Sequence, residues 1–123
     1  MLNVENSQSL HIVEFEIDNT PLYMISLELP ELRPDMEVRL AIKPMSIAIA
    51  KRFSGSISFS NRLFATVKEI ELGELLCRIK VDFNEYELEA VMSNRAIHNL
   101  NLEIGDRVVL FIKASDIFVK EVL

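Results

Sequence analysis

Hydrophobic and polar residues alternate along most of this chain, and the alternation predicts short β-strands. In residues 11–17 the apolar side chains fall on one face and the polar side chains on the other, as in a half-buried strand. Asp18-Asn19 then predicts a turn. Further strands are predicted over residues 21–27, 38–43, 46–50, 65–70, 75–81, 86–92, 107–112 and 117–122. Residues 93–100 predict a helical turn capped by Ser93 or Asn94.

The second half of the chain repeats the first. At a constant shift of 70 residues, Leu32, Val38, Leu40, Ile42, Lys43 and Ile47 match Leu102, Val108, Leu110, Ile112, Lys113 and Ile117. Upstream, residues 10–17 align loosely with residues 75–81 after a gap. Such self-similarity indicates an internal duplication. Short strands at this spacing, with one helical turn, predict an all-β fold built from small barrels.

The charge balance and the cysteine count narrow the function classes. The chain has 13 Lys and Arg against 19 Asp and Glu, a net charge of −6. No basic stripe interleaved with aromatic residues is present, so we do not expect nucleic-acid binding. No apolar run is long enough to cross a bilayer, and the N-terminus has no secretory signal. A single cysteine, Cys77, cannot form an internal disulfide, and we therefore expect a reducing, cytoplasmic location.

Catalytic and metal-binding patterns are missing from the sequence. His11 and His98 are far apart and have no cysteine partner, so each is interpreted as an ordinary surface or strand residue. The glycines are isolated turn residues and form no phosphate-binding loop. Acidic residues of segment 69–74 flank a turn and are typical of a solvated hairpin end. We predict no enzymatic activity, no direct cation site and no organic cofactor.

Hydrogen-bond donors recur beside the strand ends. Ser58, Ser60 and Asn61 precede a strand, and Ser93 opens the helical turn. Lys113-Ala114-Ser115 follows a strand directly, and the first copy has Lys43-Pro44-Met45-Ser46 at the matching place. Each residue taken alone is more often an ordinary turn residue. A tetrahedral dianion is bound by N–H groups, hydroxyls and ammonium groups, so their recurrence in both copies favours oxyanion binding.

The segment 58–119 resembles the molybdate-binding Mop or TOBE unit. The resemblance rests on the opening Ser58-Phe59-Ser60-Asn61, on Ala90-Val91-Met92-Ser93-Asn94 before the helical turn, and on two closing stretches. The closing stretches are Leu102-Glu103-Ile104-Gly105-Asp106-Arg107-Val108 and Ile112-Lys113-Ala114-Ser115. Residues 10–50 look like a first copy that lacks the opening motif. The chain is most similar to the paired-unit domain of molybdate transporter ATPases and molybdate-responsive regulators.

This resemblance implies two tandem OB-like barrels that exchange strands. The first unit would span residues 1–53, truncated at its start, and the second, complete unit residues 54–123. The implied ligand is molybdate or tungstate, and the implied partners are further copies of the chain, as a dimer or larger homo-oligomer, and molybdate transporter components. The implied oxyanion-binding residues are Ser58, Ser60, Asn61, Ser93, Lys113, Ala114 and Ser115, with Lys43 and Ser46 as weaker first-copy candidates.

Two departures from the family pattern keep a second function open. Ser60 stands where the motif has an arginine, and Pro44 has no N–H to donate in the first copy. We predict an intracellular molybdate or tungstate binder that serves as a store, a buffer, or an accessory or regulatory domain of molybdate transport. The alternative is a β-barrel interaction or dimerisation module that has lost its anion site. The sequence has neither a Walker motif nor a helix-turn-helix, and Met1 with a near-complete first copy favours a free-standing chain.

Overall fold

The computed structural model describes residues 3–7, 10–27 and 33–123 of the chain, with side chains from Leu10 onward. Within these residues most of the regular secondary structure is β-strand. Its strands are β1 Asn3–Ser7, β2 Leu10–Ile17, β3 Thr20–Ser26, β4 Val38–Ile42, β5 Ile47–Lys51, β6 Asn61–Leu72, β7 Leu76–Phe83, β8 Tyr86–Ser93, β9 Arg107–Ile112 and β10 Ile117–Val122. Its helices are α1 Asn94–Leu100 and the short 3-10 turns η1 Pro44–Ser46 and η2 Ala114–Asp116.

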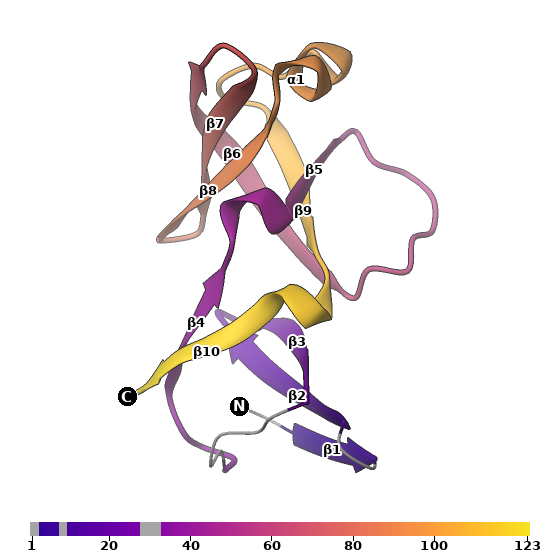
Figure 1. The fold of residues 1–123 in the computed structure, drawn as a ribbon, viewed down its shortest axis with the longest axis vertical. Helices are drawn as coiled ribbons and strands as arrows, with labels where there is room; N and C mark the ends of the chain where they lie inside the picture. Colours follow the sequence, from indigo (N-terminus) through magenta and orange to yellow (C-terminus); the bar gives the residue numbers. More distant parts are fainter. Residues whose placement is uncertain (1–2, 8–9, 28–32) are drawn as a thin grey trace.

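The strands form two curled units stacked along the long axis (Figure 1). The upper unit is a five-stranded sheet in the order β5-β9-β6-β7-β8, with α1 at its far end. The lower unit holds the three-stranded sheet β1-β2-β3 and the pair β10-β4, and the C-terminus lies there. The predicted all-β architecture of paired OB-like barrels is confirmed.

The two units exchange one strand each. β5, from the first half of the chain, pairs with β9 in the upper unit, and β10, from the second half, pairs with β4 in the lower unit. Ile42 lies opposite Ile117, and five residues further on Ile47 lies opposite Ile112, so one antiparallel register runs through both pairs. Each unit therefore contains residues from both sides of the predicted boundary between residues 53 and 54. That boundary describes the duplicated sequence, and it stays a prediction.

The internal repeat is visible in the backbone. Lys43 and Lys113 precede the two 3-10 turns with nearly the same dihedral angles, φ −69° and ψ 135° against φ −69° and ψ 140°. The hairpin turns of β2–β3 and β7–β8 also correspond, and they meet where Asn84 Nδ2 donates a hydrogen bond of 3.3 Å to Asp18 Oδ2. Leu32, one member of the predicted repeat, lies outside the described residues.

Some local structure differs from the sequence prediction. β1 was not predicted, since Asn3–Ser7 carries a single apolar residue and is defined by backbone pairing with β2. β6 begins at Asn61 rather than at Ala65 and alternates buried and exposed residues from its start. The apolar Phe64 points outward and is 73% exposed, which hides this alternation in the sequence. The two 3-10 turns were also not predicted.

A half-buried ion pair fixes the exchanged strand β5 to the upper unit. Lys51 Nζ lies 2.9 Å from Asp106 Oδ2 and also donates to the carbonyl oxygen of Asn101 at 2.6 Å. The two charged side chains are only 15% and 22% exposed, so water screens them less than it screens a surface pair. The end of β5 is thereby attached to the turn that leads into β9.

Candidate functional site

Three of the predicted binding residues meet at one end of the five-stranded sheet. Ile112 of β9 lies between Ile47 of β5 and Asn61 of β6 in a single row of paired residues. β9 runs antiparallel to both neighbours. Lys113, the residue after Ile112, therefore lies beside the residues that come directly before Ile47 and Asn61. Those residues are Ser46 and Ser60, so an ammonium group and two serines are gathered at this sheet end.

Lys113 is the one charged group in this cluster. Its side chain is exposed and makes no ion pair with any residue of the described part of the chain. Ala114 and Ser115 continue into η2, which lies against β3 of the lower unit. There Ser115 lines a shallow hollow with Leu10, Ile25 and Leu27. Ser115 and Lys113 are therefore on one turn, which joins the two units.

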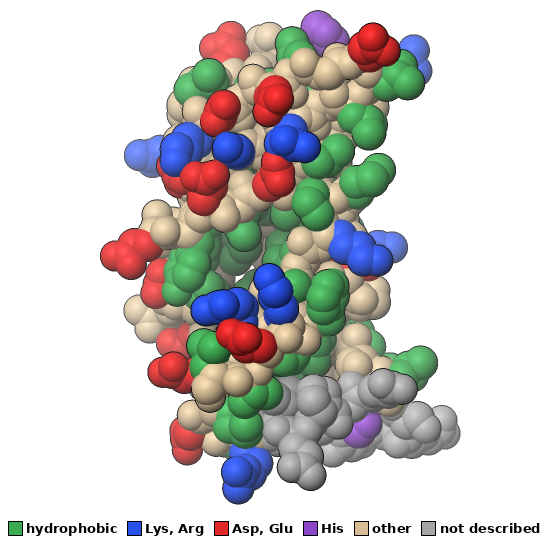
Figure 2. All heavy atoms as spheres, turned by 60° about the vertical axis from the view of Figure 1, so that its left-hand side comes forward, with side chains coloured by type: hydrophobic (Ala, Val, Ile, Leu, Met, Phe, Trp, Pro, Cys, Tyr) green, Lys and Arg blue, Asp and Glu red, His purple; other side chains and the backbone are tan. Residues whose placement is uncertain are grey.

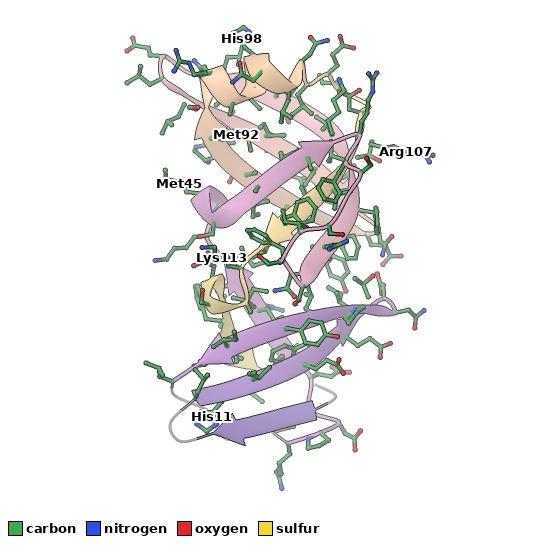
Figure 3. The ribbon with its side chains drawn as sticks, turned by 90° about the vertical axis from the view of Figure 1, so that its right-hand side faces the viewer. His11, Met45, Met92, His98, Arg107 and Lys113 are labelled. Carbon is green, nitrogen blue, oxygen red and sulfur yellow. The ribbon has the colours of Figure 1, made fainter. Side chains whose placement is uncertain are left out.

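The first-copy turn lies against a different strand. η1 packs on β8 of the upper unit, whereas η2 packs on β3. Figure 3 places Met45 of η1 between Met92 of β8 and Lys113, all on the same side of the molecule. Lys43 is exposed, like Lys113, and Ser46 is half-buried. Because Pro44 has no N–H, η1 offers one donor fewer than η2.

Ser93 is placed as a helix cap, and its hydroxyl keeps a free donor. The Ser93 Oγ accepts a hydrogen bond of 3.2 Å from the N–H of Ala96 in the first turn of α1. This bond uses an oxygen lone pair and leaves the O–H hydrogen available. Ser93 directly precedes α1 at the far end of the upper unit, whereas Lys113 directly precedes η2, which packs on β3 of the lower unit (Figure 1). The structure therefore does not bring Ser93 next to Lys113.

Asn61 has a role inside the protein that sequence reasoning missed. Its side chain is fully buried, its Oδ1 accepts from the N–H of Tyr23 at 2.7 Å, and its Nδ2 donates to the carbonyl oxygen of Tyr23 at 2.8 Å. The amide thus pairs with the edge strand β3 as a neighbouring strand would. No local sequence signal could reveal this contact, because Tyr23 contributes only its backbone. Ser58, in the exposed loop 52–60, is the remaining member of the opening motif.

The Gly-Asp part of the closing motif builds a turn. The N–H of Glu103 donates to Asp106 Oδ2 at 2.8 Å, and Gly105 has a φ of 94° that favours glycine. This backbone hydrogen bond, and after it the bond from Lys51, hold the pKa of Asp106 below its usual value. Asp106 is therefore interpreted as a structural residue that receives the exchanged strand.

A second hollow, with a volume of about 780 Å³, lies elsewhere, between the two units. Figure 2 shows it near mid-height, with hydrophobic side chains on its walls. Its charged lining residues are Glu16, Asp18, Glu37 and Arg39. Three carboxylates against one guanidinium do not favour an oxyanion, so the donor cluster at Lys113 is the better candidate.

Two further properties concern the described residues as a whole. Among residues 3–7, 10–27 and 33–123, no three histidine, cysteine, aspartate or glutamate side chains are grouped as a metal site would need. No helix in this part of the chain has the length and apolar character to cross a membrane.

Comparisons with known proteins agree with this geometry. A family model described as the TOBE domain matches residues 57–119. The chain is 34% identical over 87 residues to the molybdenum import ATP-binding protein ModC of Brucella abortus (strain 2308) and of Brucella suis biovar 1 (strain 1330). These matches cover 70% of this chain and 24% of ModC, so the chain spans about a quarter of the length of these relatives.

Two solved structures are also similar. The cytoplasmic molybdate-binding protein ModG, with molybdate bound, superposes with a TM-score of 0.88 at 23% identity over 94% of this chain and 87% of ModG, which establishes a shared fold. A molybdate-binding protein from Sporomusa ovata is 38% identical, covers 49% of this chain and 90% of its own, and gives a TM-score of 0.48.

Proposed function

This chain belongs to the TOBE domain family, and on that premise we propose that it binds molybdate with Lys113 as the charged ligand. The observation that carries the proposal is the Lys113 ammonium, which forms no ion pair with the described residues and is gathered with Ser46 and Ser60 at one end of the five-stranded sheet. An ammonium and hydroxyl groups donate to a tetrahedral dianion, and charge-assisted bonds of this kind are the strong ones. At a net charge of −6, attraction to the anion comes from these local donors.

The names of the similar proteins support the choice of ligand and of setting. ModC is named for molybdenum import, and ModG is described as a cytoplasmic molybdate-binding protein. We propose that this chain stores or buffers molybdate in the cytoplasm, or serves molybdate transport as an accessory. Tungstate is proposed as a second ligand because it is also a tetrahedral dianion. The proposal involves no enzymatic step and no organic cofactor.

The proposed site takes donors from more than one copy of the chain. Lys113 and Ser93 are both proposed ligands, but Ser93 caps α1 in the upper unit whereas Lys113 precedes η2, which packs on the lower unit. We therefore propose a homo-oligomer in which the Lys113 turn of one copy approaches the Ser93 cap of another. Ser58, Ala114 and Ser115 are proposed to complete this site. Asn61 contributes by holding β6 in place, since both its polar atoms already bind Tyr23.

Calorimetric titration of the full chain with molybdate, tungstate and sulfate tests the proposal. Lys113→Ala is expected to weaken molybdate binding by about 1.5–3 kcal/mol, the scale of a hydrogen bond to a charged group. Lys120→Ala is the matched control, because it removes the same charge from an exposed position on β10. A folded wild-type sample that gives no heat with molybdate or tungstate would contradict the function. Equal affinity for Lys113→Ala and wild type would contradict the site.

The second candidate function is an interaction module without an anion site. It is favoured by Ser60 at the motif's arginine position and by the engagement of the Asn61 amide with Tyr23. This function predicts that the chain self-associates with the same affinity with and without molybdate. Light scattering at several protein concentrations, in both conditions, distinguishes the two functions.

A further inference from the structure

The loop 52–60 is held down at its base although it has no regular secondary structure. It projects from the upper unit between β5 and β6 (Figure 1). The rings of Phe53 and Phe59 both meet the ring of Phe111 edge-on, with centroid distances of 5.1 and 5.7 Å. Phe111 lies on the outer face of β9 and is nevertheless only 3% exposed. The two ends of the loop therefore cover an apolar patch of the sheet.

Arg62 completes this attachment. Its guanidinium carbon lies 5.8 Å from the centroid of the Phe111 ring. Its Nη2 donates to the carbonyl oxygen of Ile57 at 3.2 Å, and its Nε donates to the carbonyl oxygen of Phe59 at 3.3 Å. The planar fork of an arginine can hold two acceptors at once, which a lysine cannot do with the same geometry.

These two carbonyl groups lie on either side of Ser58, and they fix the direction of two N–H groups. In a trans peptide the C=O and the following N–H point in opposite directions. With the carbonyls of Ile57 and Phe59 turned toward Arg62, the N–H groups of Ser58 and Ser60 point away from it. Neither N–H donates a hydrogen bond within the described part of the chain. Ser60 directly precedes Asn61, at the sheet end where Lys113 begins.

We propose that Arg62 is a positioning residue for the oxyanion site, which orients the backbone N–H groups of Ser58 and Ser60 as donors without touching the anion. This inference rests on the proposed function and adds a part to it. The family motif has its arginine at position 60, where this chain has a serine. The Arg62 guanidinium lies on the outer face of the sheet, whereas Asn61 points into the protein. Arg62 therefore affects the site by holding the loop, not by contacting the anion.

The test compares Arg62→Met with Arg107→Met in the full chain. Arg107 lies on the same outer face at the opposite end of the sheet, far from Lys113 in Figure 3, so its replacement removes the same charge and leaves the loop intact. Loss of two charge-assisted contacts is expected to weaken molybdate affinity about tenfold or more in Arg62→Met, and Arg107→Met to stay within about twofold of wild type. Without any anion, the backbone NMR order parameters of residues 54–60 are expected to fall only in Arg62→Met.

A third variant separates orientation from charge. Arg62→Lys keeps the positive charge and loses the fork, so it is expected to bind molybdate more weakly than wild type. Wild-type affinity in Arg62→Lys, or unchanged loop order parameters in Arg62→Met, would overturn the role of Arg62. Absence of molybdate binding by the wild-type protein would instead overturn the proposed function, and the comparison of NMR order parameters, which needs no anion, would still decide whether Arg62 orders the loop.

Discussion

At the scale of single residues, two neighbours at the start of β6 have opposite tasks. Asn61 points into the protein and pairs with the backbone of Tyr23, while Arg62 points outward and holds the loop that carries Ser58. The alternation of a strand separates the two side chains onto opposite faces. The start of β6 therefore combines an internal contact between the two units with a support for the loop.

The internal contact can be measured by replacing Asn61. In Asn61→Ala the N–H and C=O of Tyr23 lose their partner at a buried position, and the free energy of unfolding is expected to fall by about 1–3 kcal/mol. Urea denaturation followed by circular dichroism provides the measurement. Asn99→Ala, at an exposed position of α1, is the control and is expected to change stability by less than about 0.5 kcal/mol. Equal stability of the two variants would refute the role of Asn61.

The turn residue Asp106 makes stability depend on pH in a defined direction. The N–H of Glu103 and the ammonium of Lys51 lower its folded-state pKa. A lowered pKa stabilises the fold above the unfolded value of about 3.9, and this stabilisation is lost as the pH falls through the folded value. Asp106→Asn is therefore expected to be less stable than wild type at pH 7 and to lose less stability on acidification.

Urea midpoints measured from neutral to acidic pH test this difference. Parallel curves for Asp106→Asn and wild type would show that the Asp106 carboxylate is not stabilised by folding.

At the scale of elements, the outer face of β6, β7 and β8 carries alternating charges. Lys68 Nζ lies 2.8 Å from Glu87, Arg78 Nε lies 2.6 Å from Glu89, and Lys80 Nζ lies 3.7 Å from Glu69. These pairs are exposed, and each is expected to contribute at most about 1 kcal/mol to stability. Cross-strand pairing of opposite charges instead favours the correct register. We therefore interpret this face of the sheet as a solvent-exposed surface.

Most elements could be predicted from the sequence because their signals are local. Alternation marks β2, β7 and β9, and the αL conformations of Asp18, Asn19 and Asn84 agree with the predicted turns. The exchange of β5 and β10 has no local signal, because Ile47–Lys51 has the same pattern whichever copy it joins. It was predicted only through the family resemblance.

The candidate site was predictable in part for the same reason. Lys113 and Ser93 stand at strand ends that the pattern reveals, whereas the grouping of Ser46, Ser60 and Lys113 depends on the order β5-β9-β6. Arg62 lies on the opposite face of β6 from Asn61. No sequence pattern marks it as part of the site, because only the fold of the loop gives it a role.

At the scale of the whole molecule, strand exchange makes the two units dependent on each other. β9 needs β5 as its outer neighbour, and β4 needs β10. Ile47 and Ile117, the first residues of the exchanged strands, are 5% and 2% exposed. Each half of the sequence therefore completes the core of the other, and we expect the chain to unfold in one transition.

A fragment spanning residues 54–123 tests this dependence directly. It lacks β5, so β9 becomes an edge strand that pairs only with β6, and apolar side chains beside it are uncovered. We expect the fragment to be unfolded or to associate with further copies, as judged by circular dichroism and light scattering. The full chain under the same conditions is the control. A well-folded monomeric fragment would show that the second copy does not need β5.

The single register that passes through η1 and η2 also restricts how such proteins can change in length. One extra residue in η1 would move β5 by one position against β9 while β4 stayed in place against β10. A slip of one residue turns every side chain of a strand to the opposite face, so Ile47 would leave the core. Insertions and deletions in related chains should therefore be absent from these two turns, or occur in both together, and should accumulate instead at the tip of the loop 52–60.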